Sequence, residues 1–519
     1  MRKTLFILGK KHGVMFVMGV LFSLSYMQMP LFSSNQNSYF LHGLADAGYG
    51  FLNRDWLART TNHIPLFSLV IKTTFTGATP SLIYLFHGIL VFIYFISLIG
   101  ILNLLFNLQD KKTPFLLCLL VLFFIHNSPI HYLTGNRLPV LNTLPREMLL
   151  FTEGLAGQYI LGPYFQPSAF GIFLLLSLFL FLQKKEIPAM VAAVIAASFH
   201  PSYLLQTFLM ITVFFIIVMK DKRFKQGFLI AGLALLFLLP SLVYMYLNFK
   251  PSNPDLFQES QSILINYRLA HHVKPRYWFH VRACVQIVVM ILGILISRRN
   301  HKLFPVMMFL GLSSFILTII QLLTRNRTLA LMFPWRTSVI LVPVSVILLV
   351  GWIVERLSSR LKLEKLRQSY HIVAGLVIFV PILYVSGLGL RTTLQKVRGN
   401  RPLSVSKYVK ATAREQDIYL VPMNWEWFRL QSGAPIFVDG KSHPYKDSDV
   451  IEWRKRTNLA HDFYQSKDAR GAEYNMNRIL TSYAISRIIV ENNFPDLSTV
   501  SRCNILYKGD WFCIYKVDQ

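Results

Sequence analysis

Charged residues are scarce in this sequence, and acidic ones are the scarcest. Only 15% of the 519 residues are charged, with 25 Asp and Glu against 53 Lys and Arg. A soluble protein has roughly 25% charged residues. The charges gather in short clusters between long apolar runs, and a bilayer core of roughly 30 Å needs about 20 apolar residues per helix. This pattern excludes a soluble fold and predicts a polytopic α-helical membrane protein.

Common cofactor motifs are missing too. The sequence contains no Walker loop, dinucleotide fingerprint, metalloprotease helix or CxxC pair, which removes the common ATPases and NAD enzymes. Only four cysteines are present. Cys118 and Cys284 fall in apolar runs, where we expect small buried side chains. Cys503 and Cys513 flank a turn near the C-terminus, so the sequence allows either a disulfide across a hairpin or two free thiols.

The net charge of +28 does not indicate a nucleic-acid partner. Most of the excess lies in short basic loops between apolar runs, where membrane topology accounts for it. These loops are expected to attract anionic lipid headgroups.

Eleven apolar segments are predicted to cross the bilayer. Their ranges are 14–30, 81–106, 115–127, 167–183, 188–200, 202–219, 227–247, 280–297, 302–323, 336–354 and 371–389. The first has no small-x-small cleavage site, which favours an uncleaved span over a signal peptide.

Charge asymmetry predicts the orientation. With the N-terminus in the cytoplasm, the short inner segments hold 20 Lys and Arg, and the longer outer loops hold 12. The positive-inside rule favours this arrangement. The external loops are then 31–80, 128–166, 248–279 and 324–336, the C-terminus is external, and the expected location is a bacterial inner membrane.

Two domains are expected, a transmembrane domain over 1–389 and a small external α/β domain over 390–519. The second part is polar and has short β-like runs. Strands are predicted at 417–421, 435–439, 487–491, 504–507 and 511–517, and helices around 424–432 and 447–465.

The first external loop carries the motifs with the most chemical content. They are LADAGYG (44–50), LNRDWLA (52–58) and HIPLF (63–67). An acidic residue past the first span, a second aspartate and a His-x-Pro-Leu stretch resemble the GT-C glycosyltransferase superfamily, with protein O-mannosyltransferases as the closest pattern. The usual adjacent acidic pair is absent, because Ala47 follows Asp46. The stretches 428–445 and 452–456 also look like the external domain of uncharacterised bacterial GT-C-like proteins.

The resemblance implies a polyprenyl-phosphate-linked sugar donor and an envelope glycan, lipid or protein as acceptor. It assigns Asp46 or Asp55 as the catalytic carboxylate, and it allows for a divalent cation, Mg²⁺ or Mn²⁺. The hypothesis predicts that Asp55→Asn abolishes sugar transfer and leaves expression normal. A competing interpretation is that Asp55 only caps a short helix at Trp56.

A phosphate leaving group needs cations, and an arginine can bind phosphate with two parallel hydrogen bonds. Arg325, Arg327 and Arg336 at the external ends of two spans are therefore predicted to clamp the lipid phosphate. A competing interpretation is that they are interfacial arginines whose side chains snorkel to the membrane surface. His63, Glu153 and His200 complete the predicted substrate site.

Two other classes of protein remain open from the sequence. A transporter or lipid flippase usually has ionisable residues near mid-span and internal repeats, neither of which is evident here. The other alternative is a non-catalytic membrane protein of envelope assembly.

Overall fold

The computed structural model describes residues 2–108, 111–126, 151–361, 368–400, 402–500 and 502–518. The chain forms two compact units. Unit 1 comprises 1–29, 83–241 and 269–398, and unit 2 comprises 30–82, 242–268 and 399–519. The sequence prediction had grouped 30–82 and 242–268 with the transmembrane domain, whereas their contacts place them with the C-terminal part of the chain.

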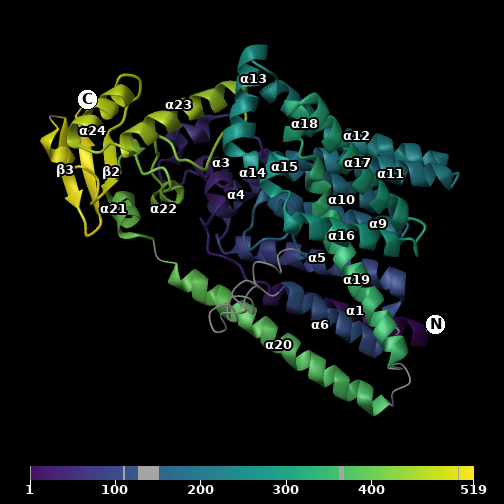
Figure 1. The fold of residues 1–519 in the computed structure, drawn as a ribbon. Helices are drawn as coiled ribbons and strands as arrows, with labels where there is room; N and C mark the ends of the chain where they lie inside the picture. Colours follow the sequence, from purple (N-terminus) through teal and green to yellow (C-terminus); the bar gives the residue numbers. More distant parts are fainter. Residues whose placement is uncertain are drawn as a thin grey trace. The chain divides into compact units, whose positions relative to one another are not determined.

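Unit 1 is built from long apolar helices (Figure 1). Among the described residues these are α1 (Arg2–Ser25), α5 (Leu82–Phe106), α6 (Lys112–His126), α9 (Ile172–Leu182), α10 (Glu186–Phe199), α11 (Leu204–Lys220), α12 (Phe224–Phe249), α16 (Val281–Ser297), α17 (Leu303–Thr324), α19 (Ser338–Arg360) and α20 (Gln368–Gly399). Each predicted span overlaps one of them. Six apolar helical stretches in the described part of the chain are long enough to cross a membrane, and the others are shorter.

The outward surface of these helices is apolar. On α12 the side chains of Phe228, Leu235 and Leu236 are each more than half exposed, and Leu323 at the end of α17 is 80% exposed. Large apolar side chains exposed in this number along a helix are rare on proteins in water but are what a lipid-facing helix requires. The chain is therefore a helical membrane protein.

Small residues allow some of these helices to approach closely. A Cβ atom at Gly293 of α16 would lie 2.2 Å from the Ser345 hydroxyl oxygen of α19. Small residues at such crossings are typical of helix packing in membranes, where van der Waals contact rather than hydrophobic burial holds helices together. On α20, the Ser386 hydroxyl donates to the Leu21 carbonyl of α1 at 2.9 Å, which joins the last apolar helix to the first.

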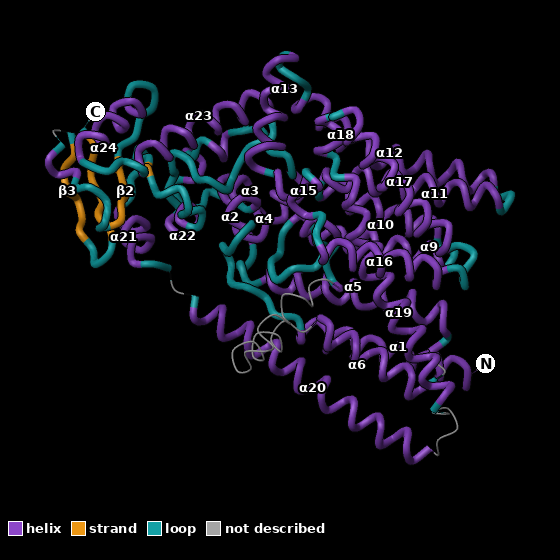
Figure 2. The backbone as a smooth tube through the Cα atoms, viewed as in Figure 1, coloured by secondary structure: helices purple, strands orange, loops and turns teal. Residues whose placement is uncertain are grey.

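Unit 2 combines short helices with one sheet (Figure 2). Its helical elements are α2 (Gln36–Tyr39), α3 (Leu41–Asp46), η1 (Leu52–Arg54), η2 (Leu57–Arg59), α4 (Pro65–Gly77), α13 (Pro254–Ile263), the π-helical turn η9 (Leu264–Arg268), α21 (Ser404–Thr412), α22 (Phe428–Ser432), α23 (Asp447–Tyr464), α24 (Ala469–Leu480) and η12 (Leu497–Thr499). The strands are β1 (Tyr419–Leu420), β2 (Arg487–Glu491), β3 (Cys503–Lys508) and β4 (Phe512–Val517).

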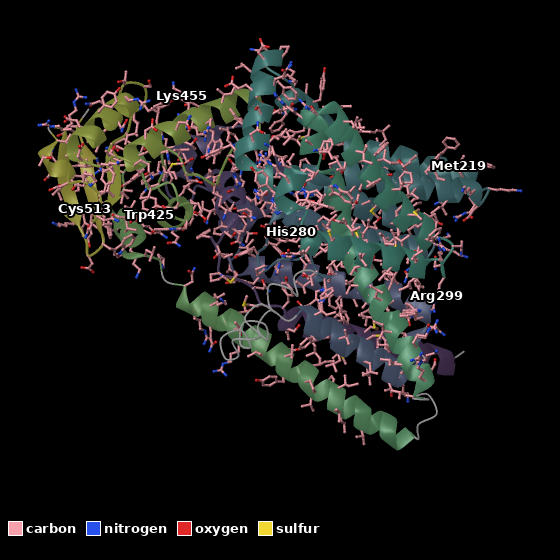
Figure 3. The ribbon with its side chains drawn as sticks, viewed as in Figure 1. Met219, His280, Arg299, Trp425, Lys455 and Cys513 are labelled. Carbon is pink, nitrogen blue, oxygen red and sulfur yellow. The ribbon has the colours of Figure 1, made fainter. Side chains whose placement is uncertain are left out.

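The sheet has the order β1-β2-β4-β3, and its central strands β2 and β4 are buried on both faces. β1 runs parallel to β2, and the other pairs are antiparallel. Ile488 and Val490 pack with α23 and α24 on one face, and Ile489 packs with α21 and α22 on the other. Cys513 and Trp425, labelled in Figure 3, belong to these two opposite core clusters. Burial on both faces explains why the strand RIIVE is an unbroken apolar run at its centre.

Two details of the C-terminal prediction are resolved. Cys503 and Cys513 are free thiols, since the β3–β4 register places Cys503 opposite Val517 and Cys513 opposite Lys508. The segment 435–439 makes only an isolated bridge, between Ile436 and Tyr419, and is not a strand. Asp439, the last residue of this segment, forms a buried ion pair with Arg429 instead.

Candidate functional site

A cationic cluster lies at one end of the unit 1 helices, and we call it the Arg336 cluster. Its members are Arg336, His200, Ser202, Tyr203 and Phe333. Arg336 Nη1 donates to the Ser202 hydroxyl and lies 3.4 Å from His200 Nε2. The guanidinium carbon lies 5.4 Å from the Tyr203 ring centre and 5.0 Å from that of Phe333. The structure thus brings two predicted residues together. Arg336 lies in η10 (Pro334–Thr337), and His200 lies at the break between α10 and η8 (Pro201–Tyr203).

A carboxylate lies at the same end of unit 1. Glu153 Oε2 accepts a hydrogen bond from Arg282 of α16 at 2.8 Å. Gln286, one helical turn further, donates to the Glu153 carbonyl oxygen at 2.9 Å. Burial raises the pKa of Glu153, and the Arg282 charge opposes this shift. Two residues along, the Leu155 amide donates to the Ser338 hydroxyl, just after η10, so the Glu153 segment packs beside the Arg336 cluster.

The backbone between these groups is strained. Ala156 and Gly157 of η6 (Leu155–Gly157) both have left-handed φ angles, 60° and 63°. The left-handed conformation costs a residue with a Cβ atom about 1–2 kcal/mol. The Ala156 carbonyl accepts from His272 Nδ1 at 2.7 Å, which holds the turn. Strain of this kind is concentrated at functional sites.

Several buried polar atoms around this turn and the Arg336 cluster have no hydrogen-bond partner among the described residues. They are Arg336 Nε, Trp335 Nε1, Trp278 Nε1, Gln206 Oε1 and both amide atoms of Gln158. An unsatisfied buried polar group costs about 1–3 kcal/mol. Their concentration at one end of the apolar helices indicates a place where water or a polar ligand completes the hydrogen bonds.

The opposite end of unit 1 has a different character. The described carboxylates there are paired with basic side chains: Glu186 with Arg223 at 2.6 Å, Asp221 with Lys302 at 3.8 Å and Glu355 with Arg299 at 2.5 Å. These pairs lie in the loops predicted to be cytoplasmic. Glu153 is therefore the one described carboxylate at the end of unit 1 that carries the Arg336 cluster.

The other two predicted phosphate-binding arginines are placed differently. Arg325 caps the end of α17 in a left-handed conformation, with φ 52°, and Arg327 begins the short helix α18 (Arg327–Leu331). Both side chains are exposed. Their exposure agrees with the interpretation as interfacial arginines. Of the three predicted arginines, Arg336 is the one with a buried guanidinium nitrogen, Nε.

Asp55 is completely buried in unit 2 and its carboxylate is fully engaged. One oxygen accepts from the amides of Leu57 and Ala58, at 2.9 and 3.4 Å. The other accepts from Arg429 Nε and the Ile436 amide, at 2.8 and 2.9 Å. Arg429 also pairs with the buried Asp439 at 3.0 Å. Asp55 thus has a structural role, capping η2 and tying the first loop to α22. Its predicted catalytic role stays a prediction.

Asp46 and His63 also lie in unit 2. Asp46 ends α3 with an exposed side chain, and its charge favours protonation of His42, one turn earlier. The His63 ring packs on Tyr445, with ring centres 4.1 Å apart. His42, His63 and Tyr445 line a small cavity with a volume of about 40 Å³, which we call the unit 2 cavity.

Two further residues of the unit 2 cavity were not predicted from the sequence. Arg268 and His443 come from η9 and from the loop before α23. Burial lowers the pKa of His443 to about 3, and the Arg268 charge acts in the same direction. Burial also lowers the pKa of His42 to about 4, against the opposing charge of Asp46. Both imidazoles are therefore neutral at physiological pH.

Lowering the pH below about 6.5 is expected to destabilise unit 2. Both histidines have folded-state pKa values below their ordinary value, so the unfolded chain binds more protons as the pH falls, and stability declines. We expect a loss of about 1–2 kcal/mol per histidine by pH 5. Thermal unfolding followed by tryptophan fluorescence between pH 7.5 and 5 measures it. His443→Asn should flatten the profile, and an unchanged slope in that variant would contradict the assignment.

Some residues of the site that were not predicted do carry a signal in the sequence. Arg282 and Gln286 are polar and four residues apart at the start of an otherwise apolar span. Polar residues on one face of such a helix mark a site in the bundle. Arg268 and His443 carried no comparable signal, because their proximity depends on contacts between segments about 170 residues apart. Across the described ranges, no group of three or more His, Cys, Asp or Glu side chains is arranged to hold a metal ion.

Comparison with known proteins gives one partial match. The profile of a domain of unknown function (DUF6798) matches residues 403–460. This segment runs from α21 to most of α23 and includes Arg429, Asp439 and His443. No curated protein matches the chain significantly. The match thus covers two of the three residues of the buried ion-pair group, Arg429 and Asp439, and part of the unit 2 cavity, and it names no activity.

Proposed function

We propose that this protein is a membrane-embedded glycosyltransferase that uses a polyprenyl-phosphate-linked sugar donor and acts at the external face of a bacterial inner membrane. The observation that carries the proposal is the Arg336 cluster. A guanidinium group is held between two aromatic rings at the end of apolar helices, and its Nε has no partner among the described residues. A lipid-linked donor keeps its polyprenyl chain in the bilayer, so its phosphate lies near the ends of the membrane-spanning helices.

Arg336 binds the phosphate of the donor in this proposal. Guanidinium groups bind phosphate through two parallel charge-assisted hydrogen bonds. The contacts with Ser202 and His200 fix the orientation of the group before the donor arrives. On sugar transfer, the same charge stabilises the phosphate that leaves.

Glu153 is the general base in this proposal. It accepts the proton of the acceptor hydroxyl as that oxygen attacks the anomeric carbon of the sugar. Its pair with Arg282 orients the carboxylate, and the burial that raises its pKa makes it a stronger base. The alternative function of a transporter or flippase finds less support, because the described ion pairs of unit 1 lie at the ends of its helices rather than at mid-span.

Binding of polyprenyl phosphate tests this proposal. The purified protein in nanodiscs should bind polyprenyl phosphate and bind the matched polyprenol more weakly. Arg336→Ala should weaken phosphate binding about 10- to 100-fold, since a hydrogen bond to a charged group contributes about 1.5–3 kcal/mol.

The matched control is Arg356→Ala, which removes the same charge from an exposed position at the opposite end of unit 1 and should leave binding unchanged. Arg336→Lys should restore part of the affinity, because it keeps the charge but loses the paired donors. Equal binding of phosphate and alcohol in the unmodified protein, or no effect of Arg336→Ala, would contradict the proposal.

A further inference from the structure

The unit 2 cavity has the size of one small polar group. Its volume is about 40 Å³, and a water molecule needs roughly 10–15 Å³ of such space. A group of three or four heavy atoms, such as a carboxylate or the terminal PO₃ of a phosphate ester, therefore fits. Thr60 and Thr61 also line a larger, open hollow of about 250 Å³. A ligand with one end in the cavity has room for the rest of its structure in this hollow.

Arg268 supplies a positive charge to the cavity. Its Nε donates to the Lys441 carbonyl at 2.9 Å, which fixes the guanidinium group. No aspartate or glutamate is among the described residues that line the cavity. His42 and His443 are neutral, and Arg268 is the one arginine or lysine among the described residues of the lining, so the cavity favours an anionic group.

The hydrogen bonds of His443 determine which of its nitrogens carries the proton. Nδ1 lies 3.3 Å from the Lys441 carbonyl, which can only accept, so Nδ1 carries the proton. In the neutral ring Nε2 is then an acceptor. Nε2 is buried and has no partner among the described residues. The cavity therefore offers an acceptor close to the cation, and it needs a ligand with a donor beside its anionic group.

We propose that the unit 2 cavity binds a sugar that carries one anionic group, either a phosphate ester or a carboxylate. The anionic oxygens accept from Arg268, and a sugar hydroxyl donates to His443 Nε2. Trp56 lines the hollow, and its ring provides an apolar wall for the C–H face of the sugar. This site lies within unit 2 and does not depend on the proposed transferase activity of unit 1.

Calorimetric titration of the full-length protein in detergent tests the site. The probes are glucose 1-phosphate, glucuronate, inorganic phosphate and uncharged glucose. We expect at least one of the two anionic sugars to bind at least tenfold more tightly than glucose, and their ratio distinguishes a phosphate from a carboxylate ligand. Arg268→Ala should weaken this binding about 10- to 100-fold. The control Arg478→Ala removes an exposed arginine of unit 2 and should have no effect.

His443→Asn separates the two halves of the site. An asparagine amide nitrogen replaces Nδ1 and keeps the bond to Lys441, but Nε2 is lost. This variant should weaken binding of the anionic sugar at least threefold. Three results would overturn the proposal: equal binding of glucose, no binding of either anionic sugar, or unchanged anionic-sugar affinity in His443→Asn. The last remains measurable even if Arg268→Ala fails to fold.

Discussion

Replacing Arg429 by methionine is expected to lower the free energy of unfolding of unit 2 by about 3–5 kcal/mol. Arg429 lies between Asp55 and Asp439, and all three side chains are at most 1% exposed. Without the guanidinium group, two buried carboxylates remain without a counter-charge. The cost of burying an unpaired charge exceeds that of losing a surface ion pair, which contributes about 0–1 kcal/mol.

Thermal unfolding of the full-length protein in detergent measures this effect. The matched control is Arg478→Met, which breaks an ion pair with Asp462 in which both side chains are 43% exposed, and its effect should stay below about 1 kcal/mol. The double variant Asp55→Asn/Arg429→Met should lose less than the sum of the two single variants, because their partners are shared. Strict additivity would show that the ion pair contributes nothing.

The same measurement separates the two roles of Asp55. An asparagine would turn an amide group toward the donors of Arg429 or Ile436, so Asp55→Asn should lower stability as well as any transfer activity. Loss of transfer with unchanged unfolding would favour the catalytic role predicted from the sequence. Loss of both would favour the structural one.

Replacing Glu153 by glutamine is expected to reduce sugar transfer about 10²- to 10⁴-fold, the usual contribution of a general base. Glutamine has the same shape and can still accept from Arg282, so the turn at η6 should be retained. The residual activity should also lose its rise with pH, because in the unmodified protein transfer falls as the pH drops through the raised pKa of Glu153.

Transfer from polyprenyl-phosphate-linked hexoses into membrane acceptors is the measurement. Glu355→Gln is the control, since this carboxylate pairs with Arg299 at the opposite end of unit 1. Polyprenyl phosphate should bind to Glu153→Gln with unchanged affinity, because a base acts on the acceptor rather than on the donor phosphate. Full transfer activity in Glu153→Gln would show that Glu153 is not the general base. The role of Arg336 would still be tested separately, by the binding of polyprenyl phosphate.

The helical part of the fold could be predicted from the sequence because its physical cause is local. A run of about 20 apolar residues must form a helix in lipid to satisfy its backbone, so all eleven predicted ranges overlap helices. The strands β2, β3 and β4 were also predicted within one or two residues, from runs rich in β-branched and aromatic side chains. The segment 435–439 has the same composition, but its neighbours leave it only one bridge.

Tertiary structure alone decided which residues share a site. Composition cannot show that Asp55, a loop aspartate among arginines and leucines, accepts four hydrogen bonds in a closed core. Nor can it show that Arg268 and His443 line one cavity. The sequence by itself determined that the chain lies in a membrane, because lipid imposes the same requirement on every apolar run. Whether a charged residue ends up in a buried ion pair, in a polar cluster or on the surface depends on contacts between segments that are distant in the sequence. These contacts form only when the whole chain folds, because only then is the surrounding surface buried.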